Sequence, residues 1–115
     1  LDSVGKMTIG VGRNLDDVGI TEHEAMTLLE HDIMRTLMEL NNIYYWFDSL
    51  SDARGSVILD MCFNLGITRF MGFKKMLTAI QNEDWNKVAD EMMDSKWARQ
   101  VGKRAVTLAA MMRDG

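Results

Sequence analysis

The stretch FDSLSDARGSVILDMCFNLG, residues 47–66, predicts a deeply buried helix. Ser51 or Asp52 supplies an N-cap, because a short oxygen-bearing side chain can accept from a free backbone N–H of the first turn. Gly66 is typical of the position just after a helix. The apolar positions between these two signals are Val57, Ile58, Met61, Cys62 and Leu65. They predict that this helix is deeply buried.

Upstream of this stretch, residues 21–40 predict a long amphipathic helix. Thr21 followed by Glu24 forms a capping box, the pairing typical of a helix start. One apolar face then follows at helical spacing: Ala25, Leu28, Leu29, Ile33, Leu37 and Leu40. Asn41 and Asn42 are expected to end this helix.

The rest of the chain divides into a short β-like segment and further helices. Residues 6–12, KMTIGVG, are β-branched and glycine-punctuated, which favours a small sheet. Shorter helices are expected at about 73–81, 84–93 and 103–112, with Asn82, Asp94 and Gly102 between them. The predicted fold is therefore α+β and predominantly α. A hairpin lobe at 1–20 is joined by the helix at 21–40 to a helical lobe at 41–115, all within one domain.

Composition excludes several classes of protein. The 115 residues are 47% hydrophobic and 26% charged, as in a single globular domain. No apolar run approaches the roughly 20 residues that a membrane helix needs. The net charge is −7 over residues 1–68 and +3 over residues 69–115. The basic half suits either an anionic polymer or an ordinary solvated surface, while a pI of about 5.1 argues against a nucleic-acid binder.

The metal-binding and thiol-bearing residues do not predict a cofactor site. Cys62 is the only cysteine and lies among apolar residues, so a buried core thiol is expected. His23 and His31 lie eight residues apart on one predicted helix, which is poor spacing for a metal ion. No metal and no cofactor are expected.

Asp2 and Thr8 flank the predicted hairpin turn. A carboxylate and a hydroxyl in that arrangement can hold and orient a water molecule. The spacing alone leaves a second interpretation open, in which Asp2 caps a turn and Thr8 is an ordinary strand residue.

The segment DSVGKMTIGVGRNL, residues 2–15, resembles the active-site hairpin of phage-type lysozymes. In that signature an Asp is followed after five residues by Thr-Ile-Gly-hydrophobic-Gly. The similarity continues in order through GITEHEAMTLLEHDI, residues 19–33, and through residues 47–66 quoted above. It extends through GFKKMLTAIQNEDWNKVADEM, residues 72–92, and SKWARQVGKRAVTLAAMMRDG, residues 95–115. The resemblance thus covers essentially the whole chain and implies a lysozyme-like fold.

The resemblance implies a muramidase, which hydrolyses the β-1,4 bond between N-acetylmuramic acid and N-acetylglucosamine in peptidoglycan. In that family a Glu protonates the glycosidic oxygen while an Asp and a Thr position the attacking water. By resemblance these last two are Asp2 and Thr8. Arg104 matches an arginine beside the catalytic Glu, where a cation is expected to tune the pKa of that acid.

Four further residues match positions that line the family's substrate cleft: Phe63, Asn64, Lys96 and Gln100. As polar residues near helix ends, the last three could equally be solvated or capping residues. Arg13 departs from the family pattern, which usually has a His there, and is expected to alter an ion pair more than the chemistry.

The family's general acid lies eight residues before the Asp, so the resemblance places it upstream of Leu1 in a longer protein. A non-catalytic peptidoglycan-binding domain with the same fold is the main alternative, and a helical DNA-binding module is a weaker one. The expected protein is a monomer whose partner is bacterial peptidoglycan. It is expected to be made in the host bacterial cytoplasm and to act on the wall in the periplasm.

Overall fold

A computed structural model of the protein describes residues 21–115 and separates the chain into two compact units, Leu1–Met38 and Glu39–Gly115. Each unit is considered by itself, and Glu39–Gly115 is called the C-terminal unit below. The predicted hairpin, with Asp2 and Thr8, lies outside the described residues. From Thr21 to Gly115 the secondary structure is entirely helical, which agrees with a predominantly α fold.

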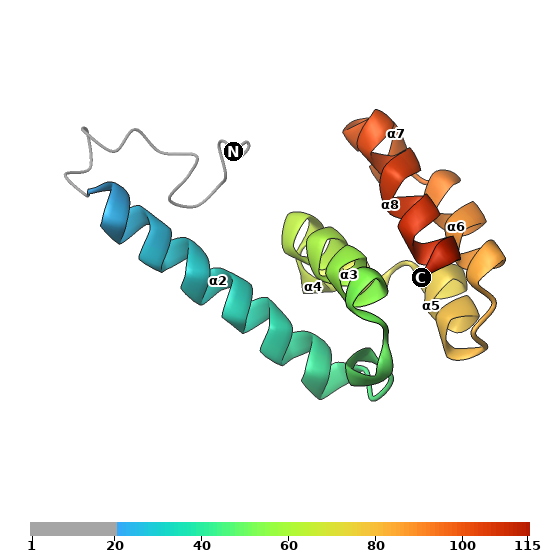
Figure 1. Ribbon diagram of the computed structural model, residues 1–115, viewed down its shortest axis with the longest axis horizontal. Coiled ribbons are helices and arrows are strands. Elements are labelled where there is room, and N and C mark those ends of the chain that lie inside the picture. Colours follow the sequence, from blue (N-terminus) through green and yellow to red (C-terminus); the bar gives the residue numbers. More distant parts are fainter. Residues whose placement is uncertain (1–20) are drawn as a thin grey trace. The chain divides into compact units, whose positions relative to one another are not determined.

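The long helix α2 spans Glu22–Ile43 (Figure 1). Its predicted capping box is present: the backbone N–H of Glu24 donates to Thr21 Oγ1 at 3.0 Å, and the Thr21 N–H donates to Glu24 Oε1 at 2.8 Å. Both carboxylates of the first turn, Glu22 and Glu24, suit the positive end of the helix dipole. The helix continues through Asn41 and Asn42 to Ile43, so the expected end was placed slightly too early.

The central helix α3, Asp52–Leu65, begins and ends where the sequence predicted. Ser51 Oγ accepts from the Arg54 N–H at 3.2 Å, and Gly66 follows with φ of 83°. This left-handed φ favours glycine because a Cβ would crowd the backbone. Val57, Ile58, Met61 and Cys62 are fully buried, as expected.

The helices α5 (Lys74–Gln81), α6 (Trp85–Met93) and α8 (Lys103–Asp114) agree with the expected ones within a residue or two. Within the C-terminal unit α6 packs against α5, α7 and α8, and α8 also packs against α3 (Figure 1). Of these helices, all except α7 contribute some of the largest fully buried side chains: Ile58, Met61, Met76, Ile80, Met92 and Met112. Methionine is common in this core because its flexible thioether fills irregular gaps.

Three short elements were not predicted: the 3₁₀ turn η2 (Phe47–Ser49), α4 (Ile67–Met71) and α7 (Lys96–Val101). Elements of three to six residues are too short to show helical periodicity. α4 nevertheless contributes the fully buried Phe70, whose ring meets Tyr44 edge to face at 5.9 Å between centroids. α7 begins at Ser95, whose hydroxyl accepts from the Ala98 N–H at 3.2 Å.

No helix in the described part of the chain is both long and apolar enough to cross a membrane. Within residues 21–115 there is also no group of three His, Cys, Asp or Glu side chains close enough to hold a metal ion.

Candidate functional site

A polar cluster joins α3 to α8 and contains two of the predicted site residues. The Arg104 guanidinium, in the first turn of α8, forms an ion pair with Asp60 through Nη2 and Oδ2. The other carboxylate oxygen of Asp60 accepts from Asn64 Nδ2 at 2.8 Å. One carboxylate thus holds both a cation and an amide in place.

The cluster lies at the surface of the C-terminal unit. The Arg104 side chain is 55% exposed and that of Asp60 is 21% exposed. A pair this accessible contributes at most about 1 kcal/mol to stability. The cluster therefore fixes the direction of two polar side chains more than it stabilises the fold.

Asp60 was not among the predicted site residues. It precedes Asn64 by four residues on the same helix, and side chains with that spacing share one helix face. This spacing was the available sequence signal, but it could not reveal the contact with Arg104, which is 44 residues away in the chain.

Lys96 and Gln100 lie four residues apart on α7, and both are exposed. Phe63 on α3 is half-buried. No contact joins these three side chains to the Arg104 cluster among the hydrogen bonds and ion pairs of residues 21–115. Their predicted role in a common cleft stays a prediction, as does that of Asp2 and Thr8.

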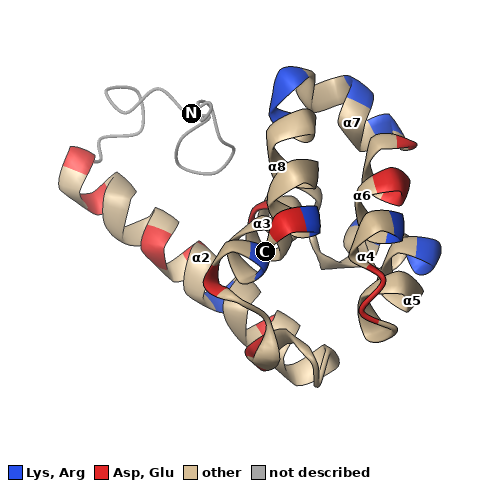
Figure 2. Cartoon of the chain, turned by 45° about the vertical axis from the view of Figure 1, so that its right-hand side comes forward, with Lys and Arg blue, Asp and Glu red and all other residues tan. Residues whose placement is uncertain are grey.

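Lys and Arg residues gather over α7 and the adjoining end of α8 (Figure 2). The residues concerned are Lys96, Arg99, Lys103 and Arg104. Asp60 is the carboxylate paired with this group among the described ion pairs. The surface can therefore attract a negatively charged group.

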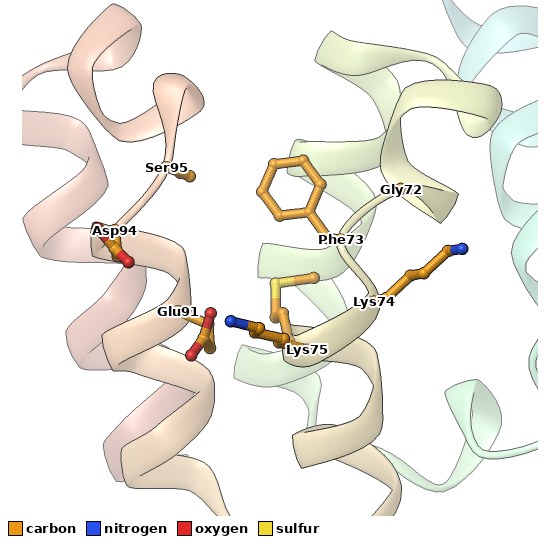
Figure 3. Close-up of a pocket in the computed structure, with 8 residues that line it drawn as sticks. Gly72, Phe73, Lys74, Lys75, Glu91, Asp94 and Ser95 are labelled. Atoms are coloured by element: carbon orange, nitrogen blue, oxygen red, sulfur yellow. The ribbon is translucent and has the colours of Figure 1, made fainter.

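A pocket of about 400 Å³ lies where the start of α5 faces the end of α6. Phe73 forms one apolar wall, and the charged ends of Lys75 and Glu91 point toward each other across the opening, while Lys74 points away (Figure 3). A ligand there would meet both signs of charge. The pocket is lined by none of the predicted site residues, although Ser95, which caps α7, forms part of its rim.

The buried thiol of Cys62 does not provide a nucleophile. Burial, and to a smaller extent the nearby charge of Glu39, raises the pKa of Cys62 to about 11. The thiolate is the reactive form of cysteine, so this group is inert near neutral pH. The expectation that Cys62 is a core residue is confirmed by its exposure of 1%.

Comparison with known proteins agrees with the helical architecture. The family model described as phage lysozyme matches residues 1–113. Probable T4-type lysozyme 1 of Dictyostelium discoideum is 28% identical in an alignment of 102 residues that covers 84% of this chain and 58% of that protein. The pre-baseplate central spike protein Gp5 of Enterobacteria phage T4 is 28% identical in an alignment of 110 residues that covers 91% of this chain and 19% of that protein. The chain thus spans little more than half of the first relative and about a fifth of the second.

Proposed function

This chain belongs to the phage lysozyme family, and on that basis we propose that it hydrolyses the glycan strands of bacterial peptidoglycan. The bond in question is the β-1,4 link between N-acetylmuramic acid and N-acetylglucosamine. The observation that carries the proposal is the family match over residues 1–113, which includes the quoted hairpin signature as well as the helices. The proposed enzyme is a monomer that uses no metal or cofactor, is made in the host bacterial cytoplasm and acts on the wall in the periplasm.

The proposed chemistry needs one carboxylic acid and one water-holding carboxylate. In an inverting glycosidase the acid protonates the leaving oxygen, while a carboxylate on the other side of the sugar activates water. We assign the second role to Asp2, with Thr8 orienting the same water. The proposed acid is a Glu.

Arg104 has a place in this scheme because a cation beside a carboxylic acid favours its charged form. The contact between Arg104 and Asp60 supports this assignment, since the pair limits the directions that the guanidinium can take. Asn64, bound to the same carboxylate, offers its amide oxygen as a hydrogen-bond acceptor at the surface. Lys96, Gln100 and Phe63 are proposed contacts to the glycan.

The test is wall lysis by the protein in its natural length, compared with Asp2→Ala and Thr8→Lys variants. Water-positioning and acid–base groups each contribute about 10²–10⁴-fold, so both variants should lose that much activity while their thermal midpoints hardly change. Lys6→Ala, in the same segment, is the matched control and should lyse at the parent rate.

A non-catalytic peptidoglycan-binding module would give a different pattern. It would sediment with purified peptidoglycan but release no reducing sugar, and Asp2→Ala would leave the sedimentation unchanged. That result would replace hydrolysis with binding as the function.

A further inference from the structure

A second pocket, of about 360 Å³, lies in the C-terminal unit among η2, the start of α3, and the α5–α6 turn. Its walls combine three aromatic rings, Tyr45, Trp46 and Trp85, with polar side chains. The polar lining consists of Ser49, Ser51, Arg54, Gln81 and Glu83. None of the residues assigned to hydrolysis lines this pocket, so a ligand there is a separate matter from the proposed function.

Of the three rings, Tyr45 offers the open surface. Trp46 stacks on Tyr44 with 4.8 Å between ring centroids, and the Arg54 guanidinium lies 3.9 Å from the centre of the Trp85 ring. Tyr45 is 82% exposed, an unusual amount for an aromatic side chain. Trp46 is 6% exposed, and its buried indole N–H, like that of Trp97 outside the pocket, has no hydrogen-bond partner within the described structure. A buried donor without an acceptor is costly, and such groups call for an explanation.

The polar side chains keep hydrogen-bonding capacity. Ser49 uses its hydroxyl proton to bind the Trp46 carbonyl at 2.8 Å, which leaves its oxygen able to accept. Ser51 accepts from the Arg54 N–H, which leaves its own proton to donate. The pocket therefore presents both donors and acceptors beside its rings.

Glu83 reaches this pocket from a strained backbone. Its φ of 55° is the one positive value at a non-glycine residue in the described part of the chain. The Glu83 N–H donates to the Ile80 carbonyl and the Asp84 N–H to the Ala79 carbonyl, the pattern of a Schellman motif, in which glycine usually takes this position. These two hydrogen bonds hold the strained turn, and the turn carries the Glu83 carboxylate at the pocket.

Together these features favour a neutral ligand with one apolar and one polar side. An apolar ligand would bury hydroxyl, amide and carboxylate groups without partners. The opposite charges of Glu83 and Arg54 offset each other for an ionic ligand, so neither an anion nor a cation is favoured. A sugar ring has both an apolar and a polar side. Its C–H face can lie on an aromatic ring, while its hydroxyl edge donates and accepts hydrogen bonds. The volume is at the lower end of the range for ligand sites, which suits one ring.

We propose that the pocket lined by Tyr45, Trp46, Trp85 and Glu83 binds an uncharged sugar ring at a site apart from the hydrolytic residues. Tyr45 covers the apolar face of the ring, and Glu83 accepts from its hydroxyls. A single ring held in this way binds weakly, with a Kd of about 1 mM or somewhat above.

The test uses the three tryptophan indole N–H signals in a ¹H–¹⁵N spectrum during titration with N-acetylglucosamine. Trp46 and Trp85 line the pocket, whereas Trp97 on α7 does not. The expected result is a saturable shift of the Trp46 and Trp85 signals with one common midpoint. Any shift of Trp97, which lies between the proposed glycan contacts Lys96 and Gln100, should follow a different midpoint. A shift of Trp97 alone, or no saturable shift, would overturn the proposal.

Two variants sharpen the result. Tyr45→Ala changes a mostly exposed side chain, so the fold should survive while sugar affinity falls at least about tenfold. Glu83→Gly suits the left-handed backbone and should also weaken binding without loss of stability. Met71→Ala, at an exposed residue outside the pocket, should bind like the parent. Parent-like affinity in Tyr45→Ala would contradict the proposal, and wall lysis measured in parallel tests the hydrolytic function independently.

Discussion

The guanidinium of Arg104 on α8 is held by the carboxylate of Asp60 on α3, and Asn64 occupies the other oxygen of that carboxylate. The family resemblance places Arg104 beside the catalytic Glu. In the described structure Arg104 also pairs with the carboxylate of Asp60. Two opposite charges at one site have opposite effects on the pKa of any carboxylic acid placed beside them.

We predict opposite shifts of the pH–lysis profile for Asp60→Asn and Arg104→Gln. Asp60→Asn removes a negative charge, so the pKa of the general acid falls and the alkaline limb moves to lower pH. Arg104→Gln removes the cation, so that pKa rises and the limb moves to higher pH. Each shift should be on the order of one pH unit or less. If the alkaline limb moved in the same direction in both variants, the assignment would be contradicted.

The same pair should matter little for stability. Because both side chains reach solvent, Asp60→Asn and Arg104→Gln should each change the free energy of unfolding by less than about 1 kcal/mol. Urea denaturation of both single variants and the double variant measures their coupling. A coupling energy of several kcal/mol would show that the pair is structural.

Arg54 should contribute much more to stability than Arg104. Its Nε donates to the Met112 carbonyl at 2.7 Å and its Nη2 to the Arg113 carbonyl at 3.0 Å, while its guanidinium lies 3.9 Å from the centre of the Trp85 ring. Arg54→Leu leaves both carbonyls without this donor and should lower the free energy of unfolding by about 2 kcal/mol.

Arg54→Lys should still show more than half of that decrease in the free energy of unfolding, because a lysine ammonium cannot reproduce the two parallel hydrogen bonds of the planar guanidinium. Arg99→Leu on exposed α7 is the matched control, with an expected change within about 0.5 kcal/mol. Equal denaturation midpoints for Arg54→Leu and the parent would contradict this prediction.

Glu83→Gly should stabilise the protein. A non-glycine residue at φ of 55° costs about 1–2 kcal/mol, which glycine avoids. Glycine also has more conformational freedom in the unfolded chain, and this lowers the net stabilisation. A net increase of up to about 1 kcal/mol is expected in thermal or urea unfolding. Glu83→Gln keeps the strain and should match the parent, whereas a glycine variant less stable than the parent would mean that the carboxylate itself stabilises the turn.

Stability should fall as the pH rises above about 9. Burial raises the pKa of Cys62 from 9.0 to about 11 in the folded protein. The folded state therefore holds its proton more tightly than the unfolded state, and this contribution is complete below pH 9 and lost as the pH rises towards 11. Burial also raises the pKa of Tyr44 from 10.0, which adds to the loss at higher pH.

The window from pH 9 to 10 isolates the thiol. Cys62→Ala is expected to have a lower thermal midpoint at every pH because it opens a cavity, but a flatter dependence between pH 9 and 10 than the parent. Identical slopes in the two proteins would assign the pH dependence to other groups.

Local sequence signals determined most of the helical framework. The capping box at Thr21, the cap at Ser51 and the glycine at Gly66 act within a few residues, so their effect can be read without knowing the fold. The apolar spacing of α3 identified its buried face for the same reason. The short α4 and α7 could not be predicted because a helix of one or two turns has no measurable period and depends on its neighbours.

Only the tertiary structure decided which distant side chains meet. Arg104 reaches Asp60 across 44 residues of sequence, and Arg54 reaches the end of α8 across 58 and 59, because α3 and α8 pack together. The sugar-sized pocket likewise combines residues from η2, α3 and the α5–α6 turn, none of which is distinctive alone. Sequence by itself specified the longer helices and the family resemblance. These contacts instead depend on helix packing, which brings together groups that no local pattern connects.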